Sequence, residues 1–365
     1  MTENGFQGDS KENYLSQIRG KYSPSQIYGV LDSLKDLKVL VVGDSIIDEY
    51  DYCQLLERAK KEPILVISHK KSDYFAGGIM AIANHVAQFS DHVDMATCVG
   101  RDKIIQDLLK NKVDKKVGMK LFMDLDHDTL LKKRYVDAYN NKHKFLEVYN
   151  RDSESLKFSE EEAVSHFEKN LGKYDLVILA DFGHGFITRH IGEAITQDAK
   201  YLALNVQTNS GNMGFNLVTK YKKADFISLT SDELQLAMHD RRSSVGSLID
   251  MLKRDMDCPK INITMGKSGM YYTQESLNYQ VPVLSDIVVD TIGAGDAVLS
   301  ITSMLSHRNA SPELIPFIGN CVGALAVKTM GNKAPVSKKD LTSLIADLLN
   351  SAKPLKRFSS SQLIK

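Results

Sequence analysis

The sequence lacks the features that mark several classes of protein. Its 365 residues include no Trp, 8 Pro and 4 Cys, and 46 Lys and Arg balance 46 Asp and Glu. A chain without net charge offers no electrostatic basis for binding nucleic acid or an anionic membrane surface, so neither partner is expected. No run of about 18 apolar residues is present, which excludes an ordinary membrane-spanning helix. The hydrophobic content of 43% is sufficient for a large buried core.

The cysteines and the N-terminal segment indicate the compartment. The four cysteines form no CxxC pair, which is typical of buried thiols in a reducing environment. The N-terminal segment MTENGFQGDSKENYLSQIRGKY carries charges where a signal peptide needs an apolar stretch. We therefore expect a cytoplasmic protein.

Apolar runs of strand length alternate with amphipathic segments of helix length. The apolar runs lie at 38–47, 93–100, 175–183, 201–207, 224–230, 260–266 and 286–293. This alternation predicts an α/β fold with a mostly parallel central sheet flanked by helices on both faces. In such a sheet the ligand crevice lies outside the carboxyl ends of the strands.

Two β-rich stretches interrupt the alternation, at about 50–75 and 127–150. The second contains Asn140-Asn141, a pair that is typical of hairpin turns. We predict that the two stretches form a small β-sheet that projects from the main domain as a lid. Exposed strand edges can pair between subunits, so a homodimer through this lid is expected.

The remaining segments suggest how the chain is organised. We expect an N-terminal helical extension over residues 1–36 and one α/β domain over 37–352. The last residues, 353–365, are basic and rich in Ser, which predicts a loose tail.

The most informative motif is DTIGAGD at 290–296, followed by an apolar helical segment. Gly293 and Gly295 allow the backbone to approach a ligand, and the amides at the helix start suit a phosphate or an oxyanion. Asp296 lies in the same turn, where the helix N-terminus favours an ionised carboxylate. Such a carboxylate can accept a proton from an attacking hydroxyl while the amides stabilise a transferring phosphoryl group. An Asp that only caps the helix is the structural alternative.

Several segments together resemble one enzyme family, the ribokinase-like (PfkB) carbohydrate kinases. DTIGAGDAVLS is similar to the family's second signature, VLVVGDSIIDEY to its first strand, AGGIMAIANHVA to its glycine-pair helix, and ITMGKSGMYY to its nucleotide-loop strand. NCVGALAVKTMGNKAPVS resembles the helix and loop that border the adenine. The resemblance covers about residues 35–350. It implies a ribokinase-like fold and a phosphotransferase that uses ATP and Mg²⁺.

Within this family the chain is most similar to the heptose-7-phosphate kinase domain of the bifunctional ADP-heptose synthesis enzymes. The similarity rests on VVGDSIIDEY, TLLKKRYVDAYNNKHKFLEVYNRD, LVILADFGHGFIT and APVSKKDL. It implies a sugar or sugar-phosphate acceptor. For the reaction itself, Asp296 matches the family's general base, and Gly293, Ala294 and Gly295 match its anion hole.

Six residues are expected to bind the acceptor: Asp48, Gly77, Gly78, Lys132, Arg134 and His184. Asp48 matches the acid that holds sugar hydroxyls, and the glycine pair matches residues that let the backbone approach the sugar. His184 and Gln207 each stand where the heptose kinases have a lysine. Lost charge-assisted contacts of this kind are worth about 1.5 to 3 kcal/mol each. Lys132, Lys133 and Arg134 are candidates to replace the missing charges.

Five residues are expected to bind the nucleotide: Thr230, Glu233, Gly266, Gly269 and Asn320. Glu233 matches the Glu of the family's NxxE motif, which organises magnesium through water. Thr230 replaces the Asn of that motif and keeps a hydroxyl oxygen. Gly266 and Gly269 match the nucleotide loop, and Asn320 lies in the helix that borders the adenine.

Three functions remain open at this point. The first is an ATP-dependent sugar or sugar-phosphate kinase, such as a heptose-phosphate kinase. The second is a kinase-shaped binding or scaffold module, which the departures from the substrate-side motifs would explain. The third is a kinase for an unphosphorylated sugar or a nucleoside. The chain is either a whole protein or the kinase half of a longer one.

Overall fold

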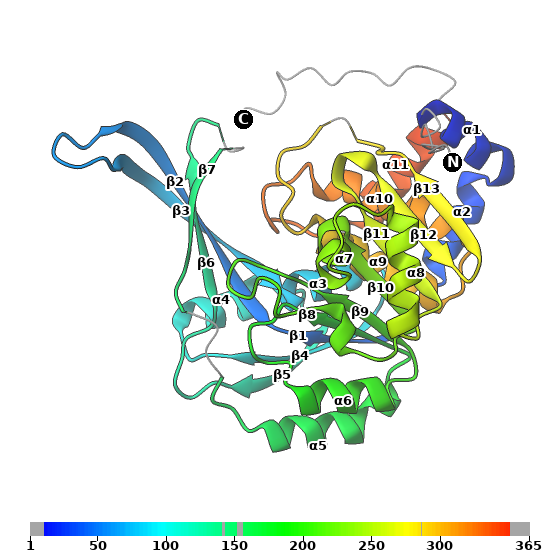
Figure 1. The fold of residues 1–365 in the computed structure, drawn as a ribbon, viewed down its shortest axis with the longest axis horizontal. Coiled ribbons are helices and arrows are strands. Elements are labelled where there is room, and N and C mark those ends of the chain that lie inside the picture. Colours follow the sequence, from blue (N-terminus) through cyan, green and yellow to red (C-terminus); the bar gives the residue numbers. More distant parts are fainter. Residues whose placement is uncertain (1–10, 141–142, 152–155, 286, 351–365) are drawn as a thin grey trace.

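The computed structural model describes residues 11–140, 143–151, 156–285 and 287–350. Its centre is a nine-stranded sheet in the order β13-β12-β11-β10-β9-β8-β1-β4-β5 (Figure 1). Neighbours from β11 to β5 run parallel, and β12 and β13 are added antiparallel at one edge. The strands are β1 (Lys38–Gly43), β4 (His92–Val99), β5 (Val117–Met123), β8 (Leu176–Asp181), β9 (Leu202–Val206), β10 (Phe226–Thr230), β11 (Lys260–Thr264), β12 (Met270–Gln274) and β13 (Leu277–Val281). The predicted α/β architecture is confirmed.

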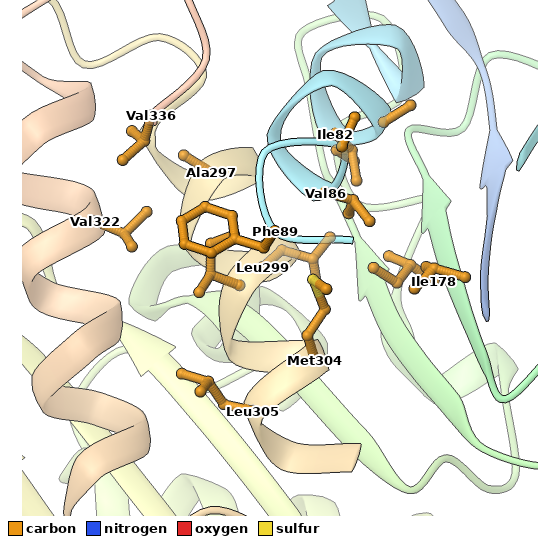
Figure 2. Packing of buried hydrophobic residues seen from close by; sticks show 14 of the residues in the cluster. Ile82, Val86, Phe89, Ile178, Ala297, Leu299, Met304, Leu305, Val322 and Val336 are labelled. Carbon is orange, nitrogen blue, oxygen red and sulfur yellow. The ribbon is translucent and has the colours of Figure 1, made fainter. Parts of the chain in front are cut away.

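Helices cover both faces of this sheet, and each set buries its own apolar cluster. One cluster takes residues from α1 (Lys11–Lys21), α2 (Pro24–Asp32), α3 (Ile79–Val86), α4 (Lys103–Asn111), α9 (Ala294–His307), α10 (Leu314–Ala326) and α11 (Lys338–Asn350). The other takes residues from α5 (Glu160–Asn170), α6 (Arg189–Asp198), α7 (Ser231–Ala237) and α8 (Val245–Asp255). In Figure 2, Leu299 and Met304 of α9 lie between Val322 of α10 and Ile82 of α3. Helix α9 is therefore at the centre of one layer.

Short polar side chains begin several of these helices. Ser23 caps α2 through a capping box with Gln26, and Pro24 occupies the first helical position. Asp102 caps α4 and Ser159 caps α5, each by accepting a backbone N–H of the first turn. No helix in the described part of the chain is long and apolar enough to cross a membrane.

A second sheet of four strands, in the order β3-β2-β6-β7, projects from the body (Figure 1). Its strands are β2 (Ser45–Arg58), β3 (Leu65–Gly78), β6 (Leu131–Asp137) and β7 (Lys144–Tyr149). β2 pairs antiparallel with β3 and parallel with β6. This is the predicted lid sheet, although β2 begins earlier than expected. Asn141 of the predicted turn and the predicted tail at 353–365 lie outside the described residues.

Two of the predicted strands need correction. The run 38–47 is not one strand, because β1 ends at Gly43 and the chain enters the lid at Ser45. Between them the Asp44 carboxylate accepts backbone N–H groups of the loop after β8, which directs the chain out of the central sheet.

The run 286–293 is not a strand over its described residues, 287–293. The backbone N–H groups of Val289 and Asp290 both donate to the Val327 carbonyl after α10, at 2.7 and 3.2 Å. The β-branched composition that suggests a strand is present, but the amides find a helix-terminal carbonyl instead of a neighbouring strand.

We expect the substitution Leu299→Ala to lower the free energy of unfolding by about 2 to 5 kcal/mol, because it leaves a cavity in the layer around α9. Leu299 is 1% exposed, whereas Leu277 on β13 is 49% exposed. Leu277→Ala is the matched control, with an expected change within about 0.5 kcal/mol. Chemical denaturation measures both, and equal losses would contradict the central position of α9.

Candidate active site

A cavity of about 270 Å³ lies at the carboxyl ends of the central strands, where the lid meets the body. Its walls come from the ends of β8 to β11, from lid strands β2 and β6, and from the start of α9. Nine of the predicted site residues line it: Asp48, Gly78, Lys132, Arg134, Thr230, Glu233, Gly293, Gly295 and Asp296. The cavity therefore has the position that a parallel α/β sheet gives to its ligands.

Asp296 occupies the first turn of α9 and is 8% exposed. The Gln207 side-chain amide donates a hydrogen bond to its Oδ1 at 3.0 Å. Burial, and then the negative charge of Asp48, raise the pKa of Asp296 to about 7, against the opposing effects of Gln207 and Lys132. Burial therefore opposes the ionisation of this carboxylate, which we expected the helix N-terminus to favour. A pKa near 7 suits a group that must accept a proton at neutral pH.

The turn before α9 has a backbone that only glycine accommodates. Gly293 has φ +79°, and a Cβ there would lie 2.0 Å from Oδ1 of Asn332. The Ala294 N–H donates to the Thr291 carbonyl at 3.3 Å, and Ala294 does not line the cavity. The N–H groups of Gly295 and Asp296 lie in the first helical turn, where a helix offers its donors no acceptor. These two amides are the better candidates for holding an anion.

Asp48 faces the cavity from lid strand β2. Arg134 donates to its Oδ1 at 2.5 Å, and Asn332 donates to its Oδ2 at 3.4 Å. Gly77 on the neighbouring strand β3 pairs with Ile46, and a Cβ there would lie 2.2 Å from Oδ2 of Asp48. Gly77 therefore makes room for the carboxylate and does not itself line the cavity. Gly78, with φ +56°, turns the chain from β3 into α3.

Two of the cations proposed as replacements already have anionic partners. Arg134 bridges Asp48 and Glu147, the latter at 2.9 Å. Lys133 pairs with Glu49 at 3.1 Å and Asp51 at 3.5 Å and does not line the cavity. Neither supplies an uncompensated positive charge to a ligand.

Lys132 and His184 differ in what they offer a ligand. Lys132 lines the cavity with its ammonium 4.9 Å from the centre of the Tyr149 ring, and it makes no ion pair with a described residue. His184 is buried outside the lining, and its backbone N–H donates to Asp44 at 3.3 Å. Burial, together with the charges of Lys132 and Arg151, lowers the pKa of His184 to about 3. His184 is therefore neutral and does not restore the charge of a lysine.

Several side-chain oxygen atoms belong to the part of the lining formed by β9, β10 and the start of α7. Glu233 accepts a hydrogen bond from the Thr230 N–H at 2.7 Å in the capping box that begins α7, and burial raises the pKa of Glu233 to about 7. Asn205 donates to the Ser228 carbonyl at 2.8 Å, and its buried Oδ1 has no hydrogen-bond partner among the described residues. Asn205 and Glu233 both line the cavity, and amide and carboxylate oxygens suit a hydrated hard cation such as Mg²⁺.

No group of three or more His, Cys, Asp or Glu side chains within the described ranges could hold a metal ion. Mg²⁺ in kinases is bound by one or two carboxylates together with phosphate oxygens and water, so it does not need such a group. The Glu233 and Asn205 oxygens therefore fit this kind of site.

The three remaining predicted nucleotide residues do not line the cavity. Gly266 and Gly269 flank a single turn after β11 with φ +53° and +86°, and a Cβ at Gly269 would lie 1.9 Å from the Val281 carbonyl oxygen. Asn320 uses both ends of its amide on the segment after β13, accepting from Leu284 at 3.3 Å and donating to Pro282 at 3.1 Å. Nucleotide contacts by these three remain predictions.

Asn205 and Asn332 are among the lining residues that the sequence analysis missed. Asn205 lies within the run 201–207, which gives no sign that its polar side chain faces a cavity. Asn332 follows Gly331 in a turn-forming pair, and its partner Asp48 is 284 residues away. Only the turn signal at Gly331-Asn332 was available, and it says nothing about that distant contact.

The sequence matches the family described as pfkB family carbohydrate kinase over residues 36–339. It is 26% identical over 318 residues to the bifunctional protein HldE of Desulfatibacillum aliphaticivorans, covering 85% of this chain and 63% of that protein. It is 27% identical over 305 residues to the bifunctional protein HldE of Aliarcobacter butzleri, covering 80% and 62%. The chain thus spans less than two thirds of the length of these relatives.

Solved structures share the fold at low sequence identity. Ribokinase from Thermotoga maritima superposes with a TM-score of 0.65 at 15% identity, covering 85% of this chain and 99% of that one. The tetrameric inhibited form of phosphofructokinase-2 from Escherichia coli gives a TM-score of 0.66 at 12% identity, covering 86% and 99%. The ribokinase-like fold is therefore shown.

Proposed function

Because the chain belongs to the pfkB family of carbohydrate kinases, phosphotransferases that act on alcohol groups, we propose that its cavity transfers the γ-phosphoryl group of ATP to a sugar hydroxyl. The observation that carries this proposal is the position of Asp296. Its buried carboxyl, with a pKa near 7, lies beside the amides that begin α9 and shares a cavity with Asp48 of the lid.

In the proposed reaction, Asp48 orients the acceptor through its hydroxyl groups and Asp296 accepts the proton of the attacking hydroxyl. The sugar oxygen forms a bond to the γ-phosphorus as the bond from that phosphorus to the bridging oxygen of ADP breaks. The amides of Gly295 and Asp296 stabilise the charge on the transferring group. Gln207 holds the Asp296 carboxylate by its 3.0 Å hydrogen bond.

Magnesium would supply charge neutralisation of the nucleotide phosphates. Glu233 and Asn205 are the residues that would hold it, through water. Thr230 supports this arrangement, because its backbone N–H orients the Glu233 carboxylate.

The acceptor that we favour is a sugar phosphate, with a heptose phosphate as the first candidate. The HldE relatives and the segment similarity to heptose-7-phosphate kinases support this choice. Lys132 supports it as well, because it lines the cavity and makes no ion pair with a described residue.

An unphosphorylated sugar or a nucleoside is the second candidate. It is favoured by the neutral His184 and by Gln207, which bonds to Asp296 where the heptose kinases have a lysine. A binding module without turnover does not require a buried carboxylate that is held by Gln207 at the start of a helix, so the position of Asp296 favours a kinase.

We expect Asp296→Asn to lower phosphorylation by about 10² to 10⁴-fold, because the amide cannot accept the hydroxyl proton. The test is ADP release and ³¹P NMR over a panel of sugars and sugar phosphates that includes seven-carbon compounds. Calorimetry with ATP and Mg²⁺ should give nearly the same affinity for both proteins. Turnover by the variant at the normal rate would refute the role of Asp296, and failure of the normal protein to bind ATP would favour a binding module.

The pH dependence should follow Asp296. Its pKa of about 7 means that the carboxyl is protonated and inactive at lower pH, so kcat/KM should fall about tenfold per unit below that value. Gln207→Leu removes a hydrogen bond that favours the ionised form, and the inflection should move to higher pH. Gln207→Lys should move it to lower pH. A profile that is flat from pH 5 to pH 8 would contradict the assignment.

We also propose that the lid forms the interface of a homodimer. The outer half of the β2–β3 hairpin exposes Leu55, Leu56, Ile64, Leu65 and Val66, each between 37% and 58%. β3 and β7 are the two edges of this sheet, and the hairpin projects away from the body (Figure 1). Exposed apolar strands at a free edge favour pairing with another copy.

The oligomeric state tests this proposal. We expect light scattering coupled to gel filtration to give twice the chain mass, and Leu65→Glu to shift the protein toward the monomer because it places a charge in the apolar contact. Leu277→Glu on β13 is the control and should leave the mass unchanged. A monomeric normal protein would contradict the lid interface.

A further inference from the structure

Asp290 is a buried carboxylate that does not line the cavity, yet it begins the DTIGAGD motif. Its side chain is 1% exposed and accepts four hydrogen bonds. Lys144 donates from 2.7 Å and Tyr50 from 2.8 Å. The backbone N–H groups of Gly331 and Ile292 donate from 3.0 and 3.2 Å. One carboxylate therefore joins side chains of the lid to two loops of the body.

The two lid donors come from different strands. Tyr50 lies on β2 and is fully buried, while Lys144 is the first residue of β7. Tyr50 belongs to a small apolar cluster of lid residues against which Ile292 and Met330 pack. The lid thus rests on the loops before α9 and after α10, with the ion pair between Lys144 and Asp290 at the contact.

Asp290 holds the loop before α9 and the loop after α10. Both loops adjoin the start of α9, where the amides of Gly295 and Asp296 form the candidate anion site. Ile292 directly precedes Gly293. Gly331 directly precedes Asn332, whose Oδ1 lies against Gly293 and whose amide donates to Asp48. A displacement of these loops would therefore shift Gly293 and disturb the hydrogen bond from Asn332 to Asp48.

We propose that Lys144 is a positioning residue that couples docking of the lid to order in the anion site. With Lys144 in place, the charge of the buried Asp290 is compensated and the carboxylate can hold Ile292 and Gly331 at once. When the β6–β7 hairpin lifts away, the carboxylate loses its cation and the uncompensated charge favours hydration and loosening of both loops. Phosphoryl transfer then proceeds only with the lid docked.

Lys133 provides a matched control for Lys144. Both lysines are on the lid, both pair with carboxylates, and their side chains are 30% and 29% exposed. Lys144→Met removes the charge at Asp290, Lys144→Arg keeps it, and Lys133→Met removes a charge that contacts neither loop. Thermal unfolding of each variant shows whether the fold is retained.

Hydrogen exchange read by mass spectrometry tests the coupling without any acceptor. In Lys144→Met we expect exchange over 287–295 and 327–333 to rise about tenfold, because local opening becomes easier. Lys144→Arg and Lys133→Met should exchange as the normal protein does. Unchanged exchange in Lys144→Met, or an equal rise in Lys133→Met, would overturn the proposal.

Steady-state kinetics of the same variants give a second test of the coupling, and this test rests on the proposed function. With the best acceptor of the panel, Lys144→Met should lower kcat about 10 to 10²-fold, as misplacement of an anion site does, and leave the KM for ATP nearly unchanged. Lys144→Arg should recover most of the loss. A kcat within twofold of normal for Lys144→Met would overturn the coupling. If no acceptor is found, the proposed function fails and the exchange experiment still decides the role of Lys144.

Discussion

The burial of several carboxylates at one edge of the sheet is the constraint on which the rest of this site depends. Five aspartates there are at most 8% exposed: Asp44, Asp48, Asp181, Asp290 and Asp296. A buried carboxylate is costly unless charges or hydrogen-bond donors compensate it. Asp44 and Asp296 have no ion pair with a described residue, and burial raises their pKa to about 6 and about 7. Burial without an ion pair among the described residues thus accompanies both of these raised pKa values.

Much of the compensation comes from the lid. Arg134 of β6 meets Asp48, and Lys144 of β7 meets Asp290, whereas Lys220 of the body pairs with Asp181. Of these three pairs, the one between Lys144 and Asp290 joins the lid to the body, because Asp48 and Arg134 both belong to the lid sheet. The lysines of the lid segment differ in their surroundings. Lys144 compensates the buried Asp290, and Lys133 pairs with Glu49 and Asp51 away from the cavity. Lys132 lines the cavity and makes no ion pair with a described residue.

The local sequence patterns predicted the layers well and the contacts between distant segments poorly. Alternation of strand and helix, and the glycine-rich turn before α9, depend on short-range chemistry that one sequence displays. The run 286–293 was misassigned because composition cannot show that its amides bond to Val327. The ionisation of Asp296 was expected from the helix start alone, whereas its burial, which the sequence does not display, raises its pKa to about 7. Asn332 was missed because its contacts with Asp48 and Gly293 arise only after folding.

The lid joins the body where β2 begins and where β3 ends, so a tilt about this junction would displace the far end of the lid more than the site. β2 starts two residues after β1 ends, β3 runs directly into α3, and the Ile79 N–H bonds to the Asp44 carbonyl at 3.2 Å. At about 3.4 Å per residue, Asp48 lies about 14 Å along the strand from Asp44, and the end of β2 lies at most about 48 Å from Asp44. A tilt that shifts the sugar-facing carboxylate by about 1 Å would therefore sweep the hairpin tip through roughly 3 to 4 Å. A contact that holds the hairpin tip in place would therefore also limit the smaller displacement of the Asp48 carboxylate.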